Sequence, residues 1–110
     1  MTMWRSILAP GARGSEGGAM MRDDEHDYGA RISLERGGAN APFAITCGIY
    51  GWMMHTRFFA AEAQADAAFG AMKADLSAIL EALPLKGEAD EATKTSASMA
   101  AISAFVDKFP

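Results

Sequence analysis

The strongest constraint on the fold is a run of strand-forming residues, Phe43 to Phe59, in which phenylalanine, isoleucine, threonine, tyrosine and tryptophan are frequent. Strands in globular proteins usually span about 5–6 residues, so one straight strand of this length is not expected. Gly48 and Gly51 mark where the run can turn. A three-residue loop over residues 49–51, with Gly51 in the left-handed region, predicts a β-hairpin. The alternative is one long strand that bends at the two glycines and pairs with a different neighbour on each side of the bend.

A shorter strand is predicted ahead of the hairpin. Apolar and polar residues alternate from Tyr28 to Glu35, which is the period-two pattern of a strand with one buried face. Residues 37–40, Gly-Gly-Ala-Asn, favour a turn because glycine and asparagine tolerate positive φ angles. Pro42 lacks a backbone N–H and therefore fits the start or the edge of the next strand.

Beyond Phe59 the apolar residues recur every three or four positions, which predicts two helices. The first is expected from Ala61 to Leu83 and to end at Pro84, and the second from an N-cap at Asp90 to about Lys108. The apolar stripe of the first contains Phe69, Met72, Leu76, Ile79, Leu80 and Leu83, and that of the second contains Met99, Ile102, Val106 and Phe109, with Phe105 beside it. The order β-β-(β)-α-α predicts an α+β domain, in which a small antiparallel sheet of two to three strands precedes two C-terminal helices packed on one face.

Residues 1–27 show neither a helical nor a strand period. Glycines at positions 11, 14, 17 and 18 are followed by the acidic run Asp23 to Asp27. We therefore expect a flexible or loosely attached N-terminal segment, with residues 28–110 forming a single domain. Met20 and Met21 stand just before the regular pattern. A further hypothesis is therefore that the natural chain begins at one of these two methionines.

Composition and charge exclude several classes of protein. The net charge is −4 and the ten basic residues are scattered, which argues against nucleic-acid binding. The chain has no apolar run near the roughly 18 residues of a membrane span. The single cysteine, Cys47, cannot form an internal disulfide, so a reducing compartment is expected and the chain is interpreted as a cytoplasmic, bacterial-type protein.

The hairpin register decides whether Cys47 and His55 can act together. In one straight strand they stand about 26 Å apart, and in a hairpin with a two- or four-residue loop they point to opposite faces. The three-residue loop pairs Cys47 with Met53 and leaves His55 two residues along on the same face, within roughly 7 Å. A lone cysteine in an apolar strand usually serves as a core residue. No catalytic residue is therefore assigned, and Cys47 is kept only as a candidate reactive thiol.

Ligand binding is a second hypothesis for this segment. His55 and Arg57 share a face of the predicted strand and suit a carboxylate or phosphate, with Tyr50 and Trp52 as apolar walls. The competing interpretation places the two basic residues at a solvent-exposed strand end and the two aromatic residues in a core or an interface. Neither a metal nor a cofactor is expected. The acidic run lacks the spacing of a calcium loop, and its one histidine has no neighbouring cysteine for zinc.

The long hydrophobic segment is apolar on both of its predicted faces, which bears on assembly. One set of side chains is Phe43, Ile45, Cys47, Met53 and Phe59, and the other includes Tyr50, Trp52, Met54 and Phe58. Two helices cover only one face, so we expect a homodimer or a higher even oligomer built on the sheet. The predicted role is structural, regulatory or partner-binding without catalysis. A small anionic ligand bound in a pocket at the oligomer interface is the alternative, and a Cys/His-dependent enzyme is the third possibility.

Overall fold

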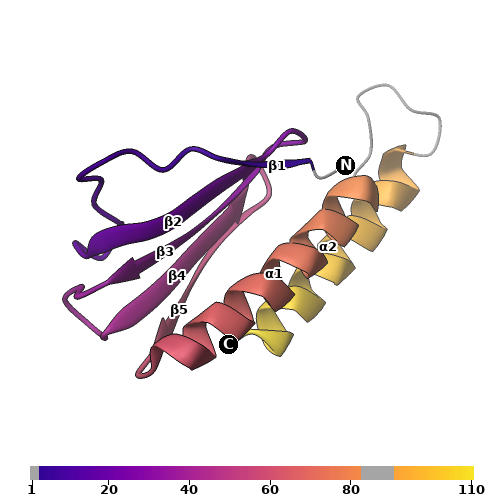
Figure 1. The fold of residues 1–110 in the computed structure, drawn as a ribbon. Coiled ribbons are helices and arrows are strands. Elements are labelled where there is room, and N and C mark those ends of the chain that lie inside the picture. The colour runs from indigo at the N-terminus through magenta and orange to yellow at the C-terminus, as the bar shows by residue number, and fades with distance from the viewer. Residues whose placement is uncertain (1–2, 83–90) are drawn as a thin grey trace.

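The computed structural model describes residues 3–82 and 91–110, and the side chains of 82 and 91–97 fall outside that description. Five strands are followed by two helices (Figure 1). The elements are β1 (Trp4–Ser6), β2 (Ala19–His26), β3 (Ala30–Arg36), β4 (Phe43–Ile49), β5 (Met53–Phe59), α1 (Glu62–Ala82) and α2 (Glu91–Lys108). Each strand pairs antiparallel with the next along the chain, so the sheet has the order β1-β2-β3-β4-β5. The predicted α+β class, with an antiparallel sheet before two helices, is confirmed.

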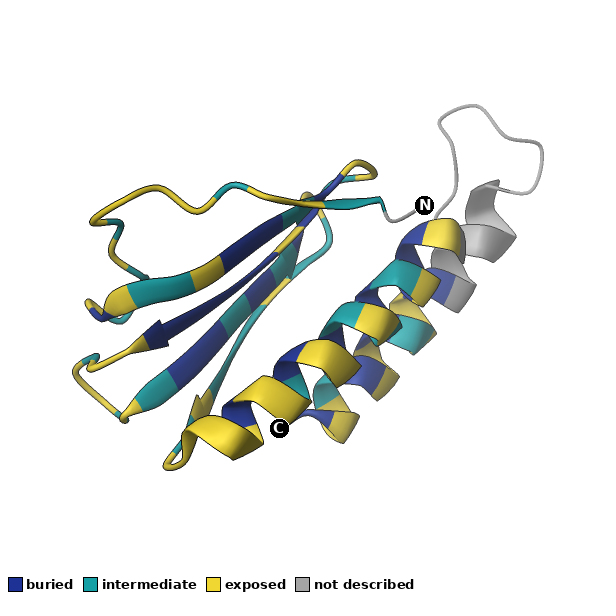
Figure 2. Ribbon diagram, viewed as in Figure 1, coloured by how far each residue is buried: buried dark blue, intermediate teal, exposed yellow. Residues whose placement is uncertain are grey.

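One face of the sheet is covered by the helices. The α1 helix lies against β3, β4 and β5, and α2 packs beside α1 (Figure 1). Buried residues follow β3, β4 and the side of α1 that faces the sheet (Figure 2). We call this the helix face; its core contains Ala30, Ile32, Leu34, Ile45, Cys47 and Ile49 from the sheet, with Phe69, Met72, Leu76, Ile102, Phe105 and Phe109 from the helices.

The prediction of two to three strands was wrong, because the sheet has five. The segment expected to be flexible, residues 1–27, carries β1 and β2, and Met20 and Met21 lie inside β2. Neighbouring carboxylates of β2 point to opposite faces of the sheet and both find cations there. Asp23 pairs with Arg31, and Asp24 pairs with Lys73 of α1. The strand therefore has no alternation of apolar and polar residues by which its period could be recognised.

The predicted β4–β5 hairpin and its three-residue loop are confirmed, but the loop lies one residue later than expected. It consists of residues 50–52, so Cys47 stands opposite His55 and not opposite Met53. Gly51 has a φ of 83°, and the Trp52 N–H donates to the Ile49 carbonyl at 2.9 Å. This is a type II turn, in which the third residue needs a positive φ. It lets Ile49 remain in the ladder, where the expected loop would have removed it.

The helices follow their predicted stripes with one exception. In α1, Phe69, Met72, Leu76, Ile79 and Leu80 are buried, as expected. From residue 98 onward, where side chains are described, the buried apolar positions are Ile102 and Phe105 of α2 and Phe109 just after it, whereas Met99 is exposed. The prediction for Met99 was wrong because the buried stripe runs through Phe105, which places Ser98 and not Met99 on the packed side. Leu83, Pro84 and the proposed N-cap Asp90 lie outside the described residues.

The glycine-rich connection between β1 and β2 folds around a buried carboxylate. Glu35 is buried and accepts hydrogen bonds from the backbone N–H groups of Glu16 at 3.1 Å and Gly18 at 2.9 Å. A Cβ atom at Gly14 would stand 1.9 Å from a carboxylate oxygen of Glu35, so only glycine fits there without rearrangement. The glycines of this connection thus allow close approach to Glu35, whereas the sequence suggested flexibility.

The same substitution at two glycines should therefore have opposite effects. Gly14→Ala should lower the free energy of unfolding by about 1–3 kcal/mol, because the added methyl displaces the Glu35 carboxylate from its donors. Gly70→Ala should raise it by about 0.5–1 kcal/mol, because Gly70 is helical and its position is open. Urea unfolding followed by circular dichroism measures both. A Gly14→Ala protein as stable as the unmodified chain would contradict the packing described for Glu35.

Candidate functional site

The face of the sheet opposite the helices, which we call the open face, carries a groove made by missing and short side chains. Across β3, β4 and β5, Arg31 stands beside Gly48 and Gly48 beside Met54. Gly48 has no side chain, and the space above its backbone is bordered by Arg31, whose guanidinium is bonded to Asp23 of β2, and by Met54, whose Cγ would touch a Cβ added at Gly48. The next row, Ser33, Thr46 and Thr56, continues the hollow with small hydroxyl residues.

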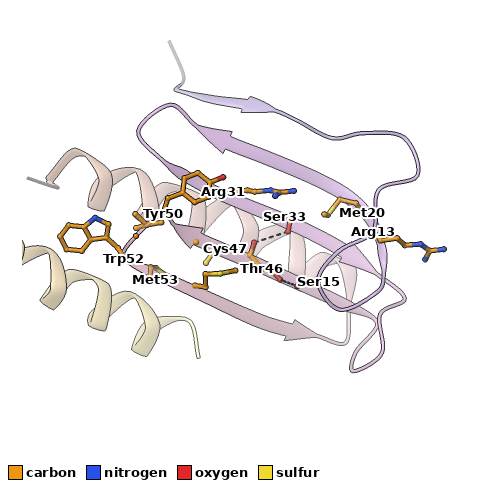
Figure 3. A pocket seen from close by; sticks show the side chains of 14 residues that line it. Arg13, Ser15, Met20, Arg31, Ser33, Thr46, Cys47, Tyr50, Trp52 and Met53 are labelled. Atoms are coloured by element: carbon orange, nitrogen blue, oxygen red, sulfur yellow. Dashed lines mark hydrogen bonds between the residues drawn. The ribbon is translucent and has the colours of Figure 1, made fainter. Parts of the chain in front are cut away.

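The groove has a volume of about 600 Å³, within the roughly 300–1,000 Å³ typical of small-molecule sites. Tyr50 and Arg31 lie together at one end, and Arg13 lies with Met20 at the other (Figure 3). Trp52 of the hairpin turn also contributes to the lining. The groove thus has aromatic and thioether walls and a floor of backbone and hydroxyl groups.

Hydrogen bonds order the polar floor. The Ser15 and Thr46 hydroxyls lie 3.0 Å apart, and those of Thr46 and Thr56 lie 3.3 Å apart. The Ser33 hydroxyl donates to the Thr46 carbonyl at 3.4 Å. This chain of hydroxyls fixes the floor, and each hydroxyl oxygen still has capacity for a further hydrogen bond.

The charged end of the groove is held by carboxylates from β2. Arg31 donates through Nε and Nη2 to the two oxygens of Asp23, at 2.8 and 2.6 Å. This hydrogen-bonded pairing raises the pKa of Arg31. The Tyr50 hydroxyl donates to Glu25 at 3.1 Å. Burial is the main cause that raises the pKa of Tyr50, and this hydrogen bond is the second cause. Near neutral pH, Arg31 is therefore a fixed cation and Tyr50 an uncharged donor.

The four residues predicted to bind a ligand do not form one site. Tyr50 and Trp52 line the groove, whereas His55 and Arg57 belong to the helix face of β5. There the His55 ring nitrogen Nε2 is in hydrogen-bond contact with the Phe109 carbonyl, and Arg57 Nε donates to the Pro110 carbonyl at 3.1 Å. These two side chains tie the end of the chain after α2 to the sheet.

The groove residues Arg13, Ser33, Thr46 and Gly48 were missed from sequence, as was the role of Arg31. They come from separate segments, and only the strand register brings them together. A signal existed in the alternation of β4, where both neighbours of Cys47 on the open face, Thr46 and Gly48, are small. Interpreting that signal required the β3–β4 pairing, which places Ser33 and Arg31 opposite them.

Cys47 and His55 are directly opposite each other on the helix face, but their surroundings do not activate the thiol. Cys47 is buried in the core, and this burial raises the pKa of its thiol to about 12. Within the described part of the chain no hydrogen bond joins Cys47 to His55, whose Nε2 is engaged by the Phe109 carbonyl. A thiol in this state lacks the thiolate character that nucleophilic cysteines need.

A polar cluster on the helix face fastens β1 and β2 to α1. Lys73 donates to Asp24 at 2.7 Å, and the Trp4 indole N–H donates to the Ser77 hydroxyl at 2.8 Å. Nearby, His26 is buried and its Nδ1 accepts the Tyr28 backbone N–H at 3.0 Å. These contacts join β1 and β2 to α1, so the cluster stabilises the packing of the sheet on the helix.

No group of three or more potential metal ligands occurs among residues 3–82 and 91–110. The helices in those ranges are too short or too polar to cross a bilayer. Comparison with known proteins finds no matching family, no matching curated protein and no matching solved structure.

The buried thiol gives a direct prediction. With a pKa of about 12, only about one part in ten thousand of Cys47 is thiolate at pH 8. Native protein should react with a disulfide reagent at least about 100-fold more slowly than the same chain in concentrated urea. A native rate equal to the unfolded rate would contradict the burial of Cys47.

His26 should make stability depend on pH. Burial lowers its pKa, with Asp27 and Glu81 acting in the opposite direction. Below the ordinary pKa of about 6.5 the unfolded chain binds a proton that the folded chain resists, so stability falls as pH falls from 7 to 5. The loss is at most about 1.4 kcal/mol per pH unit.

The variant His26→Asn keeps an acceptor for the Tyr28 N–H but cannot titrate. The free energy of unfolding, measured at several pH values, should decrease less between pH 7 and 5 in this variant than in the unmodified chain. Equal pH dependence in the two proteins would exclude His26 as its source.

Proposed function

We propose that this chain is a non-catalytic binding protein that works as a homodimer, in which β5 of one copy pairs antiparallel with β5 of a second copy. The carrying observation is that β5 is a seven-residue edge strand whose open face carries two exposed apolar side chains, Met54 and Phe58, on either side of Thr56. Met54 is 79% exposed and Phe58 is 46% exposed. Such an edge is a template for further strand pairing unless something protects it.

The two edges of the sheet differ in this respect. The edge strand β1 is only three residues long, and Arg5 on it is paired with Glu25 and Asp27. In contrast, β5 contains no proline and pairs with β4 without a register shift along its whole length. Its two basic side chains, His55 and Arg57, are turned toward the helices and bonded there. Short length and an ion-paired charge protect β1, whereas β5 is long, has no proline or bulge, and carries its basic side chains only on the helix face.

The sequence of β5 is also self-complementary about Thr56. A two-fold axis through Thr56 places Met54 of each copy opposite Phe58 of the other, because residues directly opposite share a face. The two Met–Phe pairs would bring these exposed apolar side chains into contact side by side across the new strand pair. This arrangement makes an isologous interface, the commonest kind in homodimers, and joins the two sheets into one.

The burial of the Cys47 thiol supports a role without catalysis by the Cys/His pair. The expected self-association through the sheet is thereby proposed more specifically, as pairing of the two β5 edges. The cytoplasmic location remains a prediction.

Charge at the proposed interface should dissociate the dimer. We expect Met54→Lys and Phe58→Lys to raise the dimer dissociation constant by about tenfold or more, since each change removes two cross-strand pairs and adds two charges. Met99→Lys is the matched control, because Met99 is 54% exposed and belongs to α2 and not to β5. Light scattering after size-exclusion chromatography measures the mass. A monomeric unmodified chain, or equal dissociation by Met99→Lys, would refute the proposal.

Cross-linking tests the pairing itself. Thr56→Cys places a thiol on the proposed two-fold axis, where two cysteines in opposite strands can reach disulfide distance. Oxidation should give a covalent dimer of this variant. Ser6→Cys, on the exposed edge strand β1, should remain a monomer on denaturing gels. Cross-linking of both variants to the same extent would indicate random collision instead of β5 pairing.

A further inference from the structure

We propose that the groove on the open face binds a small organic anion with an apolar body, an alkyl or aryl carboxylate whose acid group pairs with Arg31. This does not rest on the homodimer, because a single chain lines the groove by itself. Pairing at the β5 edge would extend the sheet sideways and leave the open face uncovered.

The charge of the lining selects an anion. The chain as a whole carries a net charge of −4, yet the groove is lined by two arginines, Arg13 and Arg31, and by no aspartate or glutamate. Asp23 balances the charge of Arg31, and Glu25 accepts the hydrogen bond of the Tyr50 hydroxyl, so an anion would be recognised by the donors that remain, the Arg31 Nη1 group and Arg13. Small anionic molecules are therefore favoured in the groove over cations.

Arg31 is already ordered for this task. Asp23 occupies its Nε and Nη2 groups, so the guanidinium is held in one orientation before a ligand arrives. Its Nη1 group makes no hydrogen bond within the described residues and can donate to a second carboxylate. Asp23 is buried, and its bidentate contact makes it a positioning residue for Arg31.

The remainder of the groove suits an apolar body. Opposite Arg31, across the bare backbone of Gly48, stands the exposed thioether of Met54. The Tyr50 ring lies beside Arg31 at the same end (Figure 3). A chain or ring lying on Gly48 would contact both side chains, and the Thr46 hydroxyl is placed to accept or donate one further bond. Apolar walls with few polar groups are typical of small-molecule sites.

Calorimetric titration of the full chain with octanoate tests the proposal, with octan-1-ol as the uncharged match and acetate as the anion without an apolar body. We expect saturable binding of one octanoate per chain with a dissociation constant at or below about 1 mM. Octan-1-ol and acetate should each bind at least about tenfold more weakly. Absence of saturable octanoate binding would overturn the proposal, and so would equal affinity for octan-1-ol or for acetate.

Paired substitutions locate the site without changing the net charge. The double variant Asp23→Asn with Arg31→Gln removes the cation and its partner together and should weaken octanoate binding by about tenfold or more. The matched control, Asp75→Asn with Lys108→Gln, removes the ion pair between α1 and α2, and neither residue lines the groove. It should bind octanoate within about twofold of the unmodified chain. Equal weakening by the two double variants would overturn the assignment to Arg31.

Two single variants separate the remaining explanations. Thr46→Leu fills the floor of the groove and should abolish octanoate binding while circular dichroism remains unchanged; retained binding by this folded variant would place the ligand elsewhere. Phe58→Lys lies outside the groove lining and is designed to give a monomer. It should bind octanoate as the unmodified chain does, so a failure of the dimer and a failure of the groove give different results.

Discussion

The register of the β4–β5 hairpin is the constraint on which the rest of the structure depends. The turn over residues 50–52 places Ile49 opposite Met53, and every later pair follows from that contact. Because strand side chains alternate between faces, a loop with an even number of residues would have turned the whole of β5 over. The observed register directs His55 and Arg57 to the helices and leaves Met54 and Phe58 on the open face. The proposed dimer and the proposed ligand groove both follow from this choice.

Buried carboxylates are the second organising feature, and they explain why the N-terminal part was misjudged. Asp23, Asp24 and Glu35 are all buried, and each has a specific partner: a guanidinium, an ammonium group and a pair of backbone N–H groups. An unpaired carboxylate in such positions would be costly, so these partners hold β2 and the glycine-rich connection in place. Acidic and glycine-rich sequence is typical of mobile segments, but here these residues form β2 and a connection that is bonded to the sheet.

Cys47 and His55 show how position differs from chemistry. The hairpin brings them directly opposite one another, closer than the sequence-based register would have, yet the thiol lies in an apolar core and the imidazole is held by a carbonyl of the chain end. The groove on the other face is lined by an ordered arginine, hydroxyl groups and apolar walls. That combination suits binding, which is why we favour recognition of a small anion over a reaction.

The sequence by itself determined the α+β class, the hairpin at Gly51, the helical stripe of α1 and which side chains of β4 and β5 share a face, because periodicity and glycine conformation are local properties of the chain. It did not reveal β1 and β2, since their stabilising partners Arg31 and Lys73 lie elsewhere in the chain. The groove was equally hidden. Gly48, Ser33 and Thr46 form a hollow only when three strands lie in register, and the arginines at its ends come from β3 and from the connection before β2. Only the tertiary structure decided these features, because each depends on contacts between residues distant in sequence.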